Sequence, residues 1–288
     1  MDDVTAATAA TAATAATAAT AAIAAGLTDA AGTRHHPVAA RDARIVCLVP
    51  SLTELLCDLG LSAAVVGRTG FCIHPAEKVA LIPKVGGTKD VNIEKIRQLA
   101  PTHLIVNIDE NEQPTVALLA QFIPHIIVTH PLLPRDNLAL YRLFGALFEV
   151  MPAAQHLCAE FELAWARLPV AAPRQTVVYC IWQDPWMTVS AATYIAAMLA
   201  LIGWECWTPS DDTRRYPAFS WNSAMLEQID LVCLSTEPYR FTAVHVDVLE
   251  KQLGKPVLLI DGERLSWYGS RAIAGLGYLG QLCRGESE

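Results

Sequence analysis

From residue 44 onward, short apolar runs alternate with stretches in which apolar residues recur every three or four positions. The short runs predict strands, and the three- to four-residue spacing predicts helices. Because the runs contain few polar residues, we expect strands that are buried on both faces of parallel sheets. They lie at residues 44–50, 63–67, 102–107, 125–130, 176–182, 205–207, 230–235 and 255–261.

One predicted helix, residues 152–168, separates the two sets of strands. Pro152 suits a first helical position, where the missing backbone N–H is not needed. A single buried stripe is expected to hold the apolar residues Leu157, Cys158, Phe161, Leu163 and Trp165. At about 1.5 Å per residue the helix spans roughly 25 Å, the size of a small domain. The sequence therefore predicts an α/β fold with two doubly wound parallel-sheet lobes joined by a single long helix.

These elements divide the chain into four parts. We predict a disordered, low-complexity tail over residues 1–43, a first α/β lobe over 44–134, connecting helices over 135–172 and a second α/β lobe over 173–288. The tail holds a repeated Thr-Ala-Ala triplet and the pair His35-His36, to which we assign no structural role. Alanine and threonine make a poor membrane span, and the start lacks the basic residues of a secretory signal.

Two helix starts have sequence signals of their own. Ser51 is followed three residues later by Glu54, which is the spacing of a capping box. Asn92 is expected to cap a second helix, which Pro101 ends.

Charge and cysteine content restrict the partner and the compartment. The net charge of −8 argues against nucleic acid or an anionic membrane surface as a partner. The eight cysteines are scattered and form no C-x-x-C pair, so we expect free thiols and a reducing, cytoplasmic compartment. A periplasmic location is the alternative if the first methionine is not the true start. We expect a monomer.

Ligands of such sheets bind beyond the carboxyl ends of the strands, so the loops there hold the candidate site. Aromatic side chains in these loops suit a broad, flat ligand. The candidate ligand-binding residues are Phe71, Asp109, Glu110, Asn111, Trp182, Trp186, Tyr239, Glu263, Trp267 and Tyr268. His74 and His130 are candidate metal ligands. Asp109, Glu110 or Glu263 would supply the remaining ligands of the metal ion. For each tryptophan the alternative is packing beneath a loop.

Several motifs resemble one family of binding proteins. SLTELLCDLG after the first strand, VGGTKDVNIEKIRQLAPTHLIV, a lone connecting helix and PWMTVSAATYIAAMLALIGW occur in that order over about residues 44–283. They resemble the cobalamin-binding and iron-chelate-binding receptors of ABC importers, the helical-backbone class of substrate-binding proteins. The resemblance implies a corrinoid, haem or ferric chelate held in a cleft between two lobes, with no covalent cofactor.

The resemblance also implies docking on an ABC permease through one acidic residue on each lobe. Glu54 matches the first acid, whereas Ala192 stands where the second is expected. The candidate loops carry acidic side chains together with Arg68, Arg214, Arg215, Arg240 and Arg264. An anionic catecholate chelate would require an arginine-dominated site, so this mixed set favours a corrinoid with amide arms, such as cobalamin.

Two functional hypotheses follow. In the first, the chain is a binding protein for a metal chelate, most simply cobalamin or a related corrinoid. In the second, it is a tetrapyrrole metal chelatase in which His74 or His130 acts with Glu263 to move protons and metal. A receptor for a bare metal ion is a further alternative. No G-x-S-x-G motif or catalytic triad supports hydrolysis.

Overall fold

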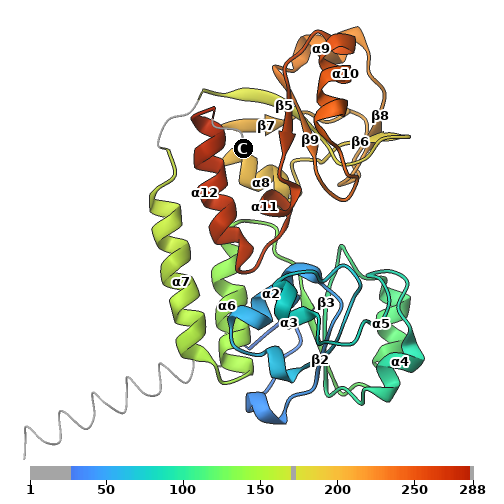
Figure 1. Ribbon diagram of the computed structural model, residues 1–288, viewed down its shortest axis with the longest axis vertical. Helices are drawn as coiled ribbons and strands as arrows, with labels where there is room; N and C mark the ends of the chain where they lie inside the picture. Colours follow the sequence, from blue (N-terminus) through green and yellow to red (C-terminus); the bar gives the residue numbers. More distant parts are fainter. Residues whose placement is uncertain (1–26, 170–172, 286–288) are drawn as a thin grey trace, which may run out of the picture. The chain divides into compact units, whose positions relative to one another are not determined.

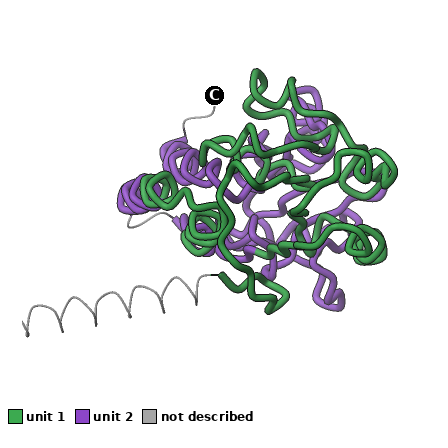
Figure 2. The backbone as a smooth tube through the Cα atoms, turned by 90° about the horizontal axis from the view of Figure 1, so that it is seen from below, with its two compact units in different colours: residues 1–130, 138–157 green, residues 131–137, 158–288 purple. Residues whose placement is uncertain are grey.

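The computed structural model describes residues 27–169 and 173–285 of the chain. The chain forms two compact units, which Figure 2 shows in different colours. Unit 1 comprises residues 1–130 and 138–157, and unit 2 comprises residues 131–137 and 158–288. The predicted long helix is present as α7 (Met151–Ala166), and its residues belong partly to each unit.

Unit 1 is built on a parallel sheet in the order β2-β1-β3-β4. Its strands are β1 (Ile45–Cys47), β2 (Val65–Arg68), β3 (His103–Asn107) and β4 (His125–Thr129). β1 and β3 are buried along their whole length, as their continuous apolar runs predict. Because all four strands are parallel, their carboxyl ends lie at the same edge of the sheet.

Helices cover both faces of this sheet (Figure 1). Ile96 of α4 (Ile93–Gln98) and Leu119 of α5 (Gln113–Leu119) pack on one face, against Val46, Leu104 and Val106. The opposite side holds α2 (Pro50–Asp58), the short α3 (Ala76–Val79) and the unit 1 part of α6 (Asp136–Leu147). Two short 3-10 turns are η1 (Ala40–Asp42) and η2 (Ser62–Ala64).

Of the two predicted helix caps, one is confirmed and one is wrong. The Asn92 side chain accepts the N–H of Lys95 at 2.9 Å, as its position before α4 predicts. Ser51 does not form a capping box, because α2 begins at Pro50 and the N-cap residue is Val49. Ser51 is buried inside the first turn, and its hydroxyl has no hydrogen-bond partner among the described residues.

The predicted boundary of the disordered tail is also wrong for its last part. Residues 27–43 are packed on unit 1, whereas the Thr-Ala-Ala repeat lies outside the described residues. The buried Asp29 accepts the N–H groups of Ala31, Thr33 and Val128 at 2.8–3.0 Å and binds the buried His35 at 3.1 Å. His35 therefore has a structural role, because its partner Asp29 covers the open edge of β4.

Unit 2 repeats the plan with a parallel sheet in the order β10-β9-β5-β7. Its strands are β5 (Gln175–Cys180), β7 (Trp204–Cys206), β9 (Leu231–Ser235) and β10 (Val257–Ile260). A small antiparallel pair, β6 (Trp186–Met187) with β8 (Ala218–Phe219), was not expected from the sequence.

Helices also cover both faces of the second sheet. Met225 of α9 (Ser223–Gln228) and Leu249 of α10 (Ala243–Leu253) pack with Val178, Val232 and Leu234 on one face. The other layer holds α8 (Tyr194–Ala200), α11 (Gly262–Ser266) and α12 (Arg271–Cys283) (Figure 1). Each unit is thus a doubly wound parallel sheet, as predicted. Among the described residues, no helix is both long and apolar enough to span a membrane.

Candidate ligand-binding site

At the carboxyl edge of unit 1, the structure brings together Asp109 and His130. The two residues follow β3 and β4, which pair in register through Asn107 and Thr129. The His130 Nε2 atom lies 3.4 Å from Asp109 Oδ2, and both side chains are partly exposed. Register alone explains this pairing, because each residue comes one or two positions after a paired strand end.

Asn111, another predicted ligand contact, connects three segments of unit 1. Its Oδ1 accepts the N–H of Asn107 at 2.9 Å, and its Nδ2 donates to the carbonyl oxygens of Thr88 at 2.9 Å and Leu48 at 3.3 Å. Both donor hydrogens of the amide are therefore used inside the protein. Buried Asn111 positions the loops that follow β1 and β3.

Phe71 is strongly exposed, with 63% of its surface accessible. Arg68 stabilises the loop that carries Phe71. Its guanidinium donates hydrogen bonds to the carbonyl oxygens of Val79 at 2.8 Å and Thr69 at 3.0 Å. Cys72 is buried and contacts the hydroxyl of Thr69 at 3.1 Å. Burial raises the pKa of the Cys72 thiol, so this group stays protonated and unreactive at neutral pH.

Two further apolar side chains, Ile73 and Ile108, are about half exposed in the loops that carry Phe71 and Asp109. Neither residue was predicted as a ligand contact from the sequence, because only aromatic and polar residues were expected to bind the ligand. The available signal was their position: each is an apolar residue within a loop that follows a strand, where polar residues are usual.

In unit 2, a continuous row of rings begins at the surface with Trp182, which is 41% exposed. Its ring meets the Tyr239 ring edge-on at 5.4 Å, and the Gln183 side chain donates to the Tyr239 hydroxyl. Next in the row, the ring centroids of Tyr239 and Phe241 lie 4.6 Å apart, and Phe241 stacks on Trp186 with the ring centroids 5.8 Å apart. Trp182 is therefore accessible at the surface and Tyr239 contacts it, whereas Trp186 lies at the other end of the row, against Phe241.

Trp267 and Tyr268 are only 8% and 7% exposed. The guanidinium of Arg271 lies over the Trp267 ring at 4.9 Å, and Tyr268 meets Tyr194 of α8 edge-on at 5.9 Å. Both rings contribute to the helical layer of α8, α11 and α12. Their predicted contact with a ligand would involve little of their surface.

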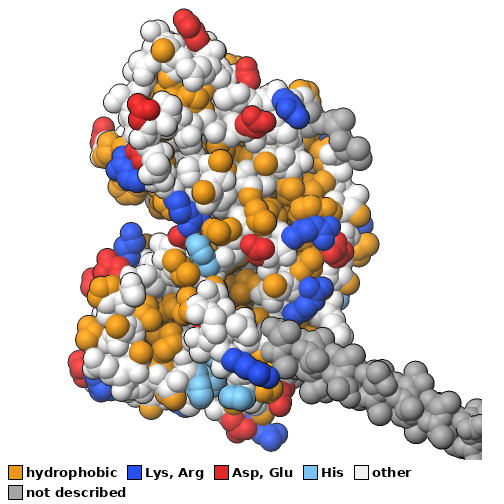
Figure 3. Space-filling model, turned by 180° about the vertical axis from the view of Figure 1, so that it is seen from behind, with side chains coloured by type: hydrophobic (Ala, Val, Ile, Leu, Met, Phe, Trp, Pro, Cys, Tyr) orange, Lys and Arg blue, Asp and Glu red, His pale blue; other side chains and the backbone are white. Residues whose placement is uncertain are grey.

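Most arginines near these loops have partners within their own unit. Arg264 Nε lies 3.0 Å from Asp261, and Arg271 Nη1 lies 3.1 Å from Glu263. Arg214 pairs with Asp212, and Arg215 donates to the Ala192 carbonyl at 3.0 Å. Acidic and basic side chains are also interspersed on the surface that Figure 3 shows. Together with buried Arg68, four of the five arginines expected near the site bind internal partners.

Direct metal ligation has little support in this arrangement. Among the described residues, no group of three or more His, Cys, Asp or Glu side chains is placed to hold a metal ion. The Asp109–His130 pair therefore lacks further ligands, and His74 lies in the Phe71 loop, partly exposed. Glu110 is also partly exposed, in the loop that follows β3.

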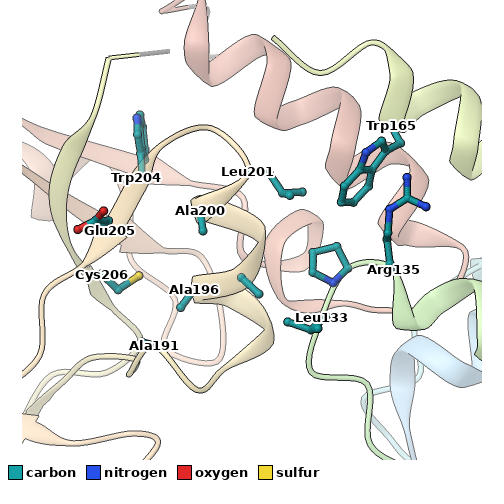
Figure 4. Close-up of a pocket in the computed structure, with 12 residues that line it drawn as sticks. Leu133, Arg135, Trp165, Ala191, Ala196, Ala200, Leu201, Trp204, Glu205 and Cys206 are labelled. Carbon is teal, nitrogen blue, oxygen red and sulfur yellow. The ribbon is translucent and has the colours of Figure 1, made fainter. Parts of the chain in front are cut away.

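A separate groove of about 600 Å³ lies within unit 2 (Figure 4). It runs along α8 between Trp165 of α7, the segment around Pro134 and the edge strand β7. Arg135 stacks over Trp165 at 4.3 Å and pairs with Glu162 at 3.1 Å. None of the predicted ligand-binding residues lines this groove, so it is distinct from the candidate site.

The fold and the strand-end loops define a two-unit α/β binding protein. A family model described as periplasmic binding protein matches residues 45–250, well over half of the chain. The chain belongs to this family of solute-binding proteins, which are not enzymes. The resemblance inferred from the sequence motifs is thereby confirmed.

Three solved structures with the same fold are 16–17% identical to this chain in sequence. The periplasmic vitamin B12 binding protein BtuF of Vibrio cholerae has a TM-score of 0.65 and 17% identity over 85% of this chain and 98% of its own. A periplasmic heme binding protein from Pseudomonas aeruginosa has a TM-score of 0.70 and 17% identity, with coverages of 85% and 94%. A possible iron-binding protein from Staphylococcus epidermidis has a TM-score of 0.67 and 16% identity, with coverages of 83% and 97%. No curated protein sequence matches the chain.

Proposed function

We propose that this protein binds a metal chelate, most specifically cobalamin or a related corrinoid, through the strand-end loops of its units. Phe71 with Asp109 and Glu110 in unit 1, and Trp182 with Tyr239 in unit 2, are the proposed contacts. The names of the similar structures, which bind vitamin B12, heme or iron, support a chelate ligand. We keep haem and ferric chelates as the alternative ligands.

The observation that favours a corrinoid is the internal pairing of the arginines. A carboxylate-bearing or catecholate chelate is bound by guanidinium groups that face the ligand. Arg264 and Arg271 instead neutralise Asp261 and Glu263. Exposed rings beside partly exposed acids suit a flat, largely apolar macrocycle with uncharged amide arms, which donate hydrogen bonds.

Isothermal titration with cobalamin, cobinamide and haem tests this proposal. We expect a corrinoid to bind with a dissociation constant below about 10 μM, near −7 kcal/mol, and more tightly than haem. An absorption spectrum and a metal analysis of freshly purified protein provide an independent check. Affinities no tighter than about 100 μM for all three ligands would rule the proposal out.

For a periplasmic location, the alternative to the cytoplasm proposed below, we further propose that the protein docks on an ABC permease through Glu54. Glu54 lies on α2 of unit 1 and is partly exposed, whereas unit 2 presents Ala192, whose carbonyl binds Arg215. The two units therefore differ in charge at the proposed docking positions. Binding of the loaded protein to the reconstituted permease should weaken in Glu54→Gln. Unchanged binding would exclude Glu54 as a docking residue.

For the compartment we propose the cytoplasm, with the periplasm as the alternative. All eight cysteines are free in the structure, and several are buried in the sheets, including Cys47, Cys180 and Cys233. Burial raises the pKa of each of these thiols. Free thiols are usual in reducing compartments. Fractionation of the native cells tests the proposed compartment. Gel filtration of the purified protein tests the proposed monomer.

A further inference from the structure

Glu237, which the sequence analysis did not place among the ligand contacts, lies at the carboxyl edge of the unit 2 sheet. It follows β9 by two residues and is partly exposed. The Tyr179 hydroxyl donates to Ser235 Oγ at 3.0 Å, and the Gly262 N–H donates to Thr236 Oγ1 at 2.9 Å. The loops after β9 and β10 are therefore in close contact, and they define the position of the Glu237 carboxyl.

This close contact depends on Gly262. A Cβ atom at residue 262 would lie 2.6 Å from Glu237 Cγ and would also clash with Ser235 Oγ. Since real Cβ contacts are longer than this, only glycine fits here without displacing the Glu237 loop. The backbone thus brings the carboxyl against the start of α11.

The partners of Glu237 differ from those of its two acidic neighbours. The Ser266 hydroxyl donates to Glu237 Oε1, and the Trp267 side chain provides a second hydrogen bond. Asp261 and Glu263 each pair with an arginine, at 3.0 and 3.1 Å. The described residues provide no ion pair for Glu237. Its negative charge is therefore not neutralised by a cation, unlike the charges beside it.

Burial raises the pKa of Glu237, and the carboxylates of Glu263 and Asp261 raise it further. The hydrogen bonds from Ser266 and Trp267 act in the opposite direction. Hydrogen-bond donors or positive charge supplied from outside the protein would stabilise the ionised form. Carboxylates brought to the same place would be repelled.

We propose that Glu237 is a further ligand-contacting residue, whose carboxylate accepts hydrogen bonds from amide N–H groups and selects amide-bearing over carboxylate-bearing macrocycles. This inference rests on the proposed function and adds a specificity residue to it. A hydrogen bond to a charged acceptor is stronger than one to a neutral acceptor, so removal of the charge should weaken the binding of an amide-bearing ligand.

The test compares wild-type protein with Glu237→Gln, which keeps the shape and removes the charge. Cobinamide, which carries amide arms, and haem, which carries carboxylates, are titrated against both proteins. We expect Glu237→Gln to bind cobinamide at least about 10-fold more weakly and haem more tightly. A general loss of structure weakens both ligands, so opposite changes exclude that explanation. Glu227→Gln, at an exposed position of α9, is the matched control and should change neither affinity.

A second readout is the proton balance of cobinamide binding. Because the ligand favours the ionised carboxylate, wild-type affinity should be lower in acid than at neutral pH, and binding in acid should release protons. Glu237→Gln should lose this pH dependence. If wild-type protein binds cobinamide and the variant matches it in affinity and pH profile, the role of Glu237 is refuted and the proposed function stands. If wild-type protein binds no corrinoid, both are refuted.

Discussion

The Gly269 backbone N–H donates to Asn137 Oδ1 at 2.6 Å, across 132 positions of sequence. The Asn137 amide also donates to the Pro134 carbonyl at 2.7 Å and to the Tyr194 hydroxyl at 2.9 Å. Asn137 is completely buried, so its three hydrogen bonds join the segment 131–137 to α8 and to the loop before α12 within unit 2.

Replacement of Asn137 by alanine should therefore be strongly destabilising. The change leaves the Gly269 N–H and the Tyr194 hydroxyl buried without this partner, and each such group costs about 1–3 kcal/mol. We expect Asn137→Ala to lower the free energy of unfolding by roughly 3 kcal/mol in urea denaturation. Asn222→Ala removes only the exposed cap of α9 and should cost about 1 kcal/mol. Equal effects of the two variants would contradict the role assigned to Asn137.

Two glycines of α12 should respond to alanine in opposite directions. A Cβ atom at Gly275 would overlap the Arg264 carbonyl oxygen of α11 and lie 3.1 Å from Met198 Cε. A Cβ atom at Gly277 would meet nothing within 4 Å. Gly277→Ala should stabilise the protein by about 0.5–1 kcal/mol, because alanine favours the helix, whereas Gly275→Ala should destabilise it by about 1–3 kcal/mol. Thermal unfolding of the two variants provides the comparison, and a stabilising Gly275→Ala would show that α11 and α12 are not in close contact.

His103 should make the protein less stable in acid. Burial and the positive charge that His125 and His35 can carry lower its pKa from 6.5 to about 4. Between these values the unfolded chain binds a proton that the folded chain does not. Stability therefore falls as the pH decreases from about 6.5 to about 4, by up to about 3 kcal/mol from this group.

The variant His103→Leu isolates this contribution. Urea midpoints measured at about pH 7.5 and about pH 4.5 should differ less in His103→Leu than in wild-type protein, whatever the substitution does to stability at neutral pH. His36→Gln, at an exposed position, is the control and should keep the wild-type difference. If the urea midpoints of His103→Leu differ between the two pH values as much as those of wild-type protein, other groups cause the loss of stability in acid.

Alanine variants of Trp182 and Trp186 should have different effects on ligand binding and on stability. Trp182 is substantially exposed, so Trp182→Ala should cost less than about 1 kcal/mol of stability but weaken cobinamide binding about 10-fold or more. Trp186 packs on Phe241 and meets Trp221 at 5.4 Å, so Trp186→Ala should cost about 2–4 kcal/mol. Urea denaturation and calorimetric titration measure the two effects. A Trp182→Ala protein with full affinity would remove this ring from the site.

The site could be predicted from the sequence only in part. The loops were identified because parallel strands bring their carboxyl ends to one edge, and Asp109 with His130 shows that this reasoning also places side chains together. The exposure of each ring could not be predicted. Trp182, Trp186 and Trp267 were all expected in loops that follow strands, but Trp186 belongs to β6 and Trp267 directly follows α11. The three rings differ in exposure because different neighbours cover them.

The sequence by itself determined the strands of the two parallel sheets, most helices and the division into two α/β units. These follow from local periodicity, because a residue's burial in a regular element repeats with the period of that element. The continuous apolar runs of β3 and β9 therefore predicted buried parallel strands, and both are buried throughout.

Only the tertiary structure decided which polar groups meet. Asp29 binds the N–H of Val128, Asn111 binds the Leu48 carbonyl, and Asn137 binds Gly269, all far apart in sequence. A side chain selects such a partner through the packing of whole elements, and no periodicity of the chain records that choice. The ordered Asp29 turn, the uncapped start of α2 and the proposed role of Glu237 all depend on contacts of this kind.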